Sequence, residues 1–223
     1  MGLHNDYASS RDKRNTGPLN DVVAHCVALD VDVLVLQEAW WWQTNESDMV
    51  DQVAEATGAT AHTYTSPTPI RRYPAKWTIA VLTRVPATRL VDAAIPAMSD
   101  QERALVRVRL HDGNVTIGGG HFDGIHSLRT KPRIWWKQYQ NLSRLASGHD
   151  VLVGDMNMWG PVVERNARPL RRAVRGRTWP ASRPHSQIDH VLVSERIEVI
   201  EAEVRADCGS DHLPIRTVLR VNE

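Results

Sequence analysis

Three short polar segments stand at the ends of apolar runs, and this arrangement constrains the fold of the chain more than any other feature. Gly154-Asp155-Met156-Asn157 directly follows the run Val151–Val153, and Ile188-Asp189-His190 comes directly before Val191–Val193. The third segment, Ser210-Asp211-His212, comes directly before another apolar stretch. Apolar runs of this length are typical of buried strands. The polar side chains should therefore lie at the rim of a sheet, where a rigid scaffold presents them to a ligand.

The rest of the chain alternates predicted strands with predicted helices and shows no repeat, low-complexity tract or linker. The three glycines before His121 indicate that the backbone there closely approaches a neighbouring group. We predict a single α+β domain over residues 1–223, because hairpin spacing is mixed with helical stretches. The predicted helices are 18–29, 47–57, 129–145 and 161–175, the last broken near Pro169. The predicted strands are 31–36, 77–82, 104–110, 115–121, 151–153 and 191–193, with 196–204 and 214–221 closing the sheet.

The overall charge gives no argument for a nucleic-acid partner, because 27 Lys and Arg residues stand against 26 Asp and Glu residues. The distribution is less even, since seven arginines lie in one short stretch. Such a cluster can meet phosphates, or it can be a solvated helix face. We take Arg171, Arg172 and Arg175 as candidate substrate-binding residues. The cluster comprises Arg165, Arg168, Arg171, Arg172, Arg175, Arg177 and Arg183.

Cys26 and Cys208 do not form a disulfide framework, and the chain opens with no signal-like segment. No apolar run approaches the roughly 20 residues that span a bilayer. We therefore expect a cytoplasmic protein without a transmembrane segment, and we make no prediction of its oligomeric state. The clustered tryptophans at 40–42 and 135–136 can pack in the core or line a substrate or partner contact.

Several of the strand-end residues suit metal-assisted hydrolysis. Glu38 and Asp211 offer the carboxylate oxygens that Mg²⁺ prefers, together with water and substrate phosphate. Asp155 and Asn157 lie on one side of an extended segment, where one can orient a water while the other holds a phosphate oxygen. The alternative interpretation of Asp155 and Asn157 is an Asx turn that follows a strand.

A carboxylate–imidazole pair is the second chemical prediction. Asp189 can bond one ring nitrogen of His212, which fixes the tautomer and favours the protonated ring. An imidazolium that faces a phosphate stabilises developing negative charge. His121 can donate a proton to a leaving oxygen. A histidine at a strand end is also commonly just a satisfied polar side chain.

With these motifs in this order, the chain resembles the endonuclease/exonuclease/phosphatase superfamily, of the deoxyribonuclease-I-like type. The resemblance spans nearly the whole chain, and residues 80–86 resemble the central strand of the family and its exit. The Gly-Asp-x-Asn and Ser-Asp-His elements are its most diagnostic parts. The matching segments are Leu36-Gln37-Glu38, Gly120-His121, Gly154-Asp155-Met156-Asn157, Ile188-Asp189-His190 and Ser210-Asp211-His212.

The resemblance implies a four-layer α/β/β/α sandwich of two packed mixed sheets and phosphoester hydrolysis that depends on Mg²⁺ or Mn²⁺. By similarity, Glu38 is the main metal ligand, and Asp211 and Asn5 are also at the metal. Similarity also implies five catalytic residues with distinct roles. Asp155 positions or deprotonates the attacking water, Asn157 contacts the phosphate, Asp189 pairs with His212 at the phosphate, and His121 is a second acid or phosphate contact.

The chain departs from the family pattern at three places. Only Met1–His4 precede Asn5, where the family has a full strand. The stretch Tyr73–Trp77 lacks the acid that often pairs with the second histidine, so His121 has no obvious partner. His190 stands where the family usually has a tyrosine.

We predict a nuclease or phosphodiesterase that cleaves nucleic acid by attack of an activated water. One alternative is an inositol-phosphate phosphatase or a sphingomyelinase-like phospholipase of the same superfamily. An alternative of another class is a non-catalytic binding module with the same fold. The partner is accordingly nucleic acid or another phosphorylated substrate.

Overall fold

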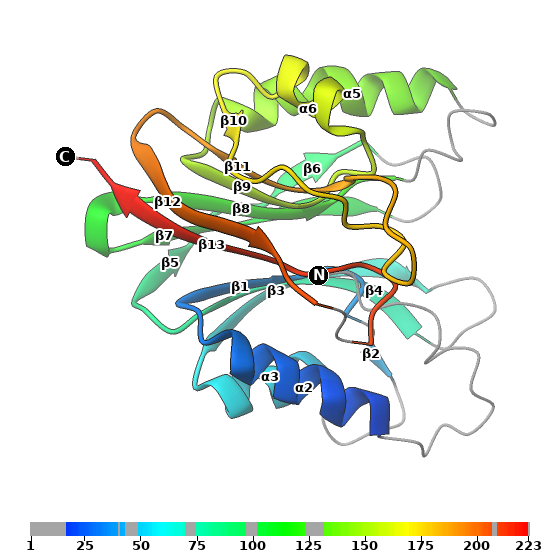
Figure 1. Ribbon diagram of the computed structural model, residues 1–223, viewed down its shortest axis with the longest axis vertical. Coiled ribbons are helices and arrows are strands. Elements are labelled where there is room, and N and C mark those ends of the chain that lie inside the picture. The colour runs from blue at the N-terminus through cyan, green and yellow to red at the C-terminus, as the bar shows by residue number, and fades with distance from the viewer. Residues whose placement is uncertain are drawn as a thin grey trace.

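The computed structural model describes residues 17–39, 41–42, 49–69, 75–96, 102–123, 132–206 and 209–222. Two sheets face each other, and helices cover their outer sides (Figure 1). Helices α2 and α3 lie on one side and α5 and α6 on the other, so that the order of layers is α/β/β/α. The helices are α2 (Gly17–Leu29), α3 (Met49–Thr57), α5 (Pro132–Ala146) and α6 (Gly160–Asn166), with a 3₁₀ turn at Asp112–Asn114.

The first sheet is built around one central strand, to which three other strands pair in antiparallel fashion. Val33 pairs with Thr83 and Leu36 with Ala80, so β1 runs toward Glu38 alongside the centre of the sheet. Its strands are β1 (Val33–Leu36), β2 (Trp41–Trp42), β3 (Thr60–Pro69) and the central β4 (Ala75–Thr83).

The second sheet carries most of the predicted site, and its strand order is β10-β11-β9-β8-β7-β5, with β6 also pairing with β7. The β8–β9 pair is parallel, and the other pairs are antiparallel. The strands are β5 (Ala87–Arg89), β6 (Ala93–Ile95), β7 (Arg103–Leu110), β8 (Thr116–His121), β9 (Val151–Asp155), β10 (Arg171–Arg172) and β11 (Asp189–Val193).

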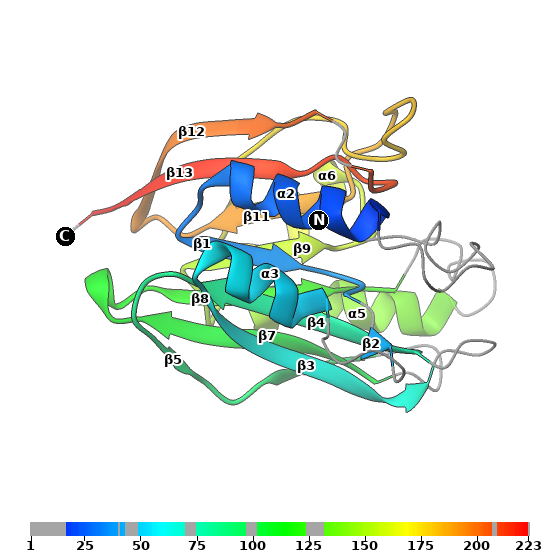
Figure 2. The ribbon, with the colours of Figure 1, turned by 90° about the horizontal axis from the view of Figure 1, so that it is seen from below.

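The last two strands, β12 (Ile197–Val204) and β13 (Ile215–Val221), correct the prediction that they close the sheet. They form a separate antiparallel ladder, and in the described residues neither pairs with a strand of the two large sheets. Figure 2 shows β12 and β13 side by side, above β1 in that view. A cavity of about 330 Å³ lies between β1 and β13 and is lined by apolar side chains such as Val33 and Leu219.

Burial of apolar side chains accounts for the layers. One cluster fills the space between the sheets, and two further clusters lie under α5 with α6 and under α2 with α3. Gly119 allows the sheets to approach, because a Cβ there would lie 2.6 Å from Val81 and 2.8 Å from Val35 of the opposite sheet. A Cβ at Gly118 or Gly120 would instead meet Leu105 of the neighbouring strand β7. The predicted α+β sandwich is confirmed.

The predicted helix over residues 161–175 is wrong in its second half. Helix α6 ends at Asn166, and Arg171–Arg172 form β10, which pairs with Leu192 and Val193 of β11. Pro169 cannot continue a helix, because it has no N–H to donate. The free edge of β11 offers backbone partners to the segment that follows. No helix of the described residues is long and apolar enough to cross a membrane.

Candidate active site

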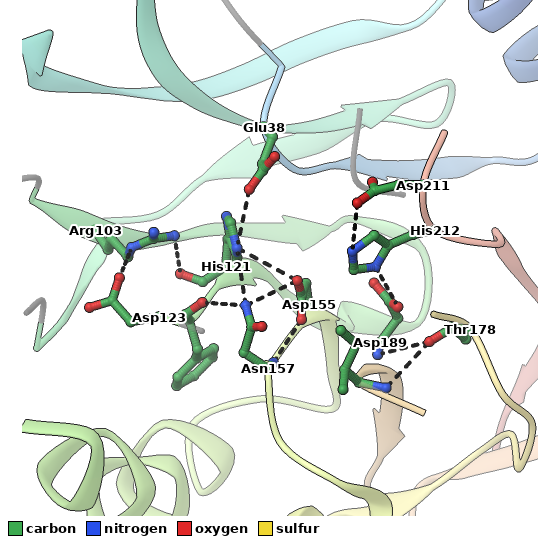
Figure 3. A network of polar contacts seen from close by, with 12 residues as sticks. Glu38, Arg103, His121, Asp123, Asp155, Asn157, Thr178, Asp189, Asp211 and His212 are labelled. Carbon is green, nitrogen blue, oxygen red and sulfur yellow. Dashed lines mark hydrogen bonds and ion pairs between the residues drawn. The ribbon is translucent and has the colours of Figure 1, made fainter. Parts of the chain in front are cut away.

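The predicted catalytic residues meet at one edge of the second sheet. His121, Asp155 and Asp189 form one row across three strands, because His121 pairs with Asp155 and Asp155 with Asp189 in the ladder register. Glu38 reaches this row from the end of β1 in the opposite sheet, and His212 reaches it from the loop before β13 (Figure 3). Segments that lie far apart in the sequence thus supply one polar cluster.

Asp189 and His212 form the predicted carboxylate–imidazole pair. His212 Nδ1 lies 2.9 Å from Asp189 Oδ2, and both side chains are buried. Burial opposes the positive charge, but the hydrogen bond and the charge of Asp189 outweigh it and raise the pKa of His212 to about 9. Burial likewise opposes ionisation of Asp189, yet its bond to His212 lowers its pKa. The pair is therefore an imidazolium and a carboxylate at neutral pH.

His121 has the neighbours that the sequence did not reveal. Its Nε2 atom lies 3.6 Å from Glu38 Oε1, 3.6 Å from Asp155 Oδ2 and 3.3 Å from Asn157 Nδ2. Burial, followed by the charges of Arg103 and His212, holds the pKa of His121 well below its usual value. The ring is accordingly neutral and contacts its neighbours as a hydrogen-bonding group.

Asn157 fulfils the Asx-turn interpretation, and its contact with a phosphate stays a prediction. Its backbone N–H donates to Asp155 Oδ1 over 2.7 Å, which is an Asx turn. Its side-chain amide donates to Asp155 Oδ2 at 3.1 Å and to the carbonyl of Phe122 at 2.8 Å. The turn thus locks the carboxylate of Asp155 beside His121.

The carboxylates of the site are short of positive charge. Burial raises the pKa of Glu38 to about 8, and the negative charge of Asp155 adds to this effect. Burial and the charge of Asp189 raise the pKa of Asp155 to about 7. Glu38 Oε2 and Asp189 Oδ1 are buried and accept no hydrogen bond from the described part of the chain. Buried carboxylates in this condition are a suitable environment for a cation.

The donor set fits a hard divalent cation. Asp155, Asp189 and His212 bring one ligand atom each to within 4.8 Å of one another. Because Asp189 and His212 are already bonded to each other, the carboxylates of Glu38 and Asp211 are the better oxygen ligands. Asp211 Oδ2 lies 3.9 Å from His212 Nε2, and its charge contributes to the raised pKa of Glu38. The predicted ligand Asn5 lies outside the described residues.

Two site residues adopt left-handed backbone conformations. Glu38 has φ 56° and Asn157 has φ 49°. Asparagine tolerates this region, whereas glutamate rarely adopts it. Strain of this kind persists where the surrounding structure fixes the residue, and it concentrates at functional sites.

Sequence reasoning missed three polar residues that support the site: Arg103, Asp123 and Thr178. Arg103 forms an ion pair with Asp123, with 2.6 Å between Nε and Oδ1. Thr178 Oγ1 accepts from the backbone N–H of Asp189 at 3.3 Å. Arg103 lies just before the strand predicted over residues 104–110, and Asp123 lies two residues after His121, but neither position carries a recognisable motif. Their contacts depend on how β7, β8 and α5 come together.

His190 has a structural role rather than a place in the catalytic row. The ring is almost fully buried, and its Nε2 atom lies 2.9 Å from the carbonyl oxygen of Met158. Burial lowers the pKa of His190 to about 4. The neutral ring therefore ties β11 to the loop after β9.

The arginine cluster corrects the expectation that Arg172 faces a substrate. The Arg172 side chain is 7% exposed, and its guanidinium donates to Glu164 at 2.7 Å and to Gln187 at 3.2 Å. Arg171 donates to the carbonyl of Ile197, and Arg175, at 70% exposure, pairs with Glu164. In β10, Arg171 pairs with Val193, which lies at the end of β11 opposite to Asp189. Substrate binding by Arg171 and Arg175 stays a prediction.

The fold and the site define the class of the protein: an α/β/β/α sandwich with carboxylates and histidines gathered at one sheet edge. The model of the Endonuclease/Exonuclease/phosphatase family matches residues 5–212, and the chain belongs to this family. Members of the family are generally hydrolytic phosphoesterases, act on phosphorylated substrates and usually depend on a divalent metal. The sequence matches none of the curated proteins.

Several solved structures share the fold. An endonuclease/exonuclease/phosphatase from Beutenbergia cavernae is 19% identical with a TM-score of 0.70, and the match covers 92% of this chain but 66% of that one. The human Nocturnin catalytic domain is 14% identical with a TM-score of 0.64, covering 92% and 87%. The mannosyl-6-phosphatase of Bacteroides thetaiotaomicron is 14% identical with a TM-score of 0.64, covering 99% and 96%. These likenesses show the fold.

Proposed function

We propose that this protein is a divalent-metal-dependent phosphodiesterase that cleaves nucleic acid by attack of an activated water on phosphorus. The observation that carries the proposal is the row of His121, Asp155 and Asp189 at one sheet edge, faced by Glu38 from the other sheet. Such a row presents groups to a phosphoester from two sides. The Asp189–His212 pair provides a fixed positive charge beside the carboxylates.

Asp155 is the residue that accepts the proton of the attacking water. Its pKa of about 7 suits a general base that works near neutral pH. The Asx turn of Asn157 holds the carboxylate in one orientation. As the water oxygen bonds to phosphorus, the bond from phosphorus to the leaving oxygen breaks, and the water proton passes to Asp155.

Three further groups handle the negative charge of the phosphate. The imidazolium of His212 stabilises the charge that develops on the phosphate oxygens. Asn157 contacts the phosphate through its side-chain amide, which exchanges its bond to Asp155 or Phe122 for this contact. His121 offers a ring N–H as a phosphate contact, since its lowered pKa does not suit a general acid. Glu38, Asp211 and Asn5 would hold a Mg²⁺ or Mn²⁺ ion, which would supply Lewis-acid stabilisation of the same charge.

A loop beside His212 supports a nucleic-acid substrate. The bridge between Trp179 and Ser186 closes a hairpin that presents the exposed side chains of Arg183 and His185. The Trp179 ring lies 6.5 Å from the His212 ring and 5.3 Å from the His185 ring, centroid to centroid. An aromatic ring with nearby cations suits a stacked base and its phosphate.

The second candidate is a phosphatase that acts on a small phosphorylated substrate, such as an inositol phosphate, with a phospholipase as its relative. The internal ion pair of Arg172 favours this candidate, because it removes one guanidinium from those available to a long polyanion. The tryptophans at 40–42 do not bear on the choice, since their side chains lie outside the described residues.

The experiment measures hydrolysis with EDTA, Mg²⁺ or Mn²⁺ on supercoiled plasmid, single-stranded DNA, RNA, an inositol polyphosphate and sphingomyelin. We expect metal-dependent cleavage of a nucleic acid that is lost in Asp155→Asn. The matched control is Asp150→Asn, because Asp150 adjoins the other end of β9 and pairs there with Arg196. Full activity of Asp155→Asn would overturn the mechanism, and a response to the inositol phosphate or sphingomyelin alone would favour the second candidate.

A further inference from the structure

A buried ion pair lies beside His121, outside the row of catalytic residues. Arg103 Nε lies 2.6 Å from Asp123 Oδ1, and the two side chains are 13% and 6% exposed. Figure 3 shows the pair next to His121, on the side away from His212. Burying two opposite charges is costly unless further hydrogen bonds hold them. The surroundings of the pair supply such bonds.

Gln138 of α5 holds Asp123 both at its backbone and at its carboxylate. Its Oε1 atom accepts from the backbone N–H of Asp123 at 3.1 Å, and its Nε2 atom donates to Asp123 Oδ2 at 3.1 Å. The same Nε2 donates to the carbonyl of Pro96, and the Gln138 side chain is fully buried. Asp123 is thus anchored to a helix, and its anchorage fixes the guanidinium of Arg103.

Arg103 supports His121 in two ways, one direct and one through Trp77. Its Nη1 atom donates to the backbone carbonyl of His121 at 3.4 Å. Its guanidinium also lies over the ring of Trp77, 5.8 Å from the centroid. Trp77 in turn presents its ring to that of His121 edge-on, with 5.9 Å between centroids and an interplanar angle of 71°. Arg103 therefore supports both the backbone of His121 and one wall of its ring.

The same strand offers a comparison with a purely structural arginine. Arg107 lies four residues further along β7, and its Nε donates to Nε2 of the buried His149 at 3.0 Å. It also donates to the carbonyl of Val91. Neither partner belongs to the catalytic row. Arg103 and Arg107 thus lie on one strand, and each contacts a different buried histidine. They differ in whether that histidine belongs to the site.

We propose that Arg103 is a positioning residue for His121, held in place by Asp123 and Gln138. The inference rests on the proposed function for its effect on rate, but its effect on the His121 ring is independent of activity. Loss of the guanidinium leaves Trp77 and the end of β8 without their shared support, so the His121 ring shifts relative to Glu38 and Asp155. A lysine keeps the charge but loses the planar fork that bridges Asp123 and the His121 carbonyl.

The test compares Arg103→Gln with Arg107→Gln. We expect Arg103→Gln to lower kcat by about 10- to 100-fold with little change in KM, because catalytic geometry tolerates small displacements poorly. Arg103→Lys should fall between Arg103→Gln and the wild type. We also expect the ring NMR signals of His121, assigned from His121→Gln, to shift in Arg103→Gln and to stay in place in Arg107→Gln.

Chemical rescue separates positioning from general stability. In Arg103→Ala, added ethylguanidinium should restore part of the lost kcat, whereas it should do nothing for Arg107→Ala. Melting curves identify variants that fail to fold, and Arg103→Lys then takes the place of Arg103→Gln. Equal losses in the Arg103 and Arg107 variants, or unmoved His121 signals, would overturn the proposal. Wild-type protein without hydrolytic activity would overturn the proposed function, while the NMR comparison would still decide the role of Arg103.

Discussion

The two halves of the site differ in how their charges are balanced. Asp189 and His212 neutralise each other across 2.9 Å, and each moves the pKa of the other toward the ionised form. Glu38 and Asp155 face a neutral His121 at 3.6 Å, and burial raises both of their pKa values. One half is complete within the chain, whereas the other has a surplus of negative charge that a divalent cation would offset.

The two halves differ in their roles and in their effect on stability. The complete half preorganises a positive charge without any ligand, which suits stabilisation of a transition state. The incomplete half lowers the stability of the metal-free protein, as binding sites commonly do. Variants in both halves should therefore lose activity, but only variants in the complete half should also lose stability.

The largest effect is expected from Glu38→Gln. Metal-stimulated hydrolysis should fall by on the order of 10³-fold, because the proposed metal loses its main carboxylate. The melting temperature in EDTA should stay the same or rise, since the variant removes a buried carboxylate whose ionisation is unfavourable. Kinetics with Mg²⁺ and thermal unfolding in EDTA measure the two quantities.

Asp189→Asn is the matched variant in the complete half. It should lower activity and also lower the free energy of unfolding by about 3–5 kcal/mol, because it leaves the buried imidazolium of His212 unpaired. If Glu38→Gln destabilised the protein as much as Asp189→Asn, the two halves would not differ as described.

An intermediate effect is expected from pH. In EDTA, the contribution of Glu38 to the free energy of unfolding should fall as pH rises from 4.5 to about 8, because the folded state holds the proton of Glu38 more tightly than the unfolded chain. Asp155, with its pKa raised to about 7, acts in the same direction. His121 and His190, whose pKa values burial lowers, act in the opposite direction below pH 6.5. His212 adds stability that is fully present below pH 6.5 and is lost as pH rises through about 9. Unfolding by urea at several pH values measures the sum.

Saturating Mg²⁺ is the control for this pH series. It should remove most of the loss between pH 4.5 and 8 and leave the decline near pH 9 unchanged, because only the acidic half binds the cation. A pH profile that Mg²⁺ does not alter would contradict the assignment of Glu38 to a metal site.

The smallest effects are expected outside the site. There, Arg172 and Arg175 both pair with Glu164, and the two arginine side chains differ in burial. Arg172→Ala should lower the free energy of unfolding by about 1–3 kcal/mol, because it leaves the contacts to Glu164 and Gln187 unmade at a nearly buried position. Arg175→Ala, at 70% exposure, should cost less than about 1 kcal/mol. Urea unfolding compares the two. A loss of DNA cleavage in Arg172→Ala with unchanged stability would restore the predicted substrate role of Arg172.

Local sequence was sufficient where a residue and its partners lie within one element or at one strand end. Apolar runs predicted β9 and β11 with their polar ends, and Pro18 and Gly58 fall at the start of α2 and just after the end of α3. The Asx turn at Asp155 and Asn157 follows from side chains that hydrogen-bond to nearby backbone. The order of the motifs also identified the family, which the match over residues 5–212 confirms.

Tertiary structure decided what depends on contacts between distant segments. The helix predicted over residues 161–175 yields to β10, because pairing with the edge of β11 provides backbone hydrogen bonds that Pro169 denies to a helix. The partners of His121 are Glu38 and Asp155, and they meet only because apolar side chains pack the two sheets face to face. Periodicity and motif spacing record which side chains are buried, whereas the identity of their neighbours across the core is set by packing.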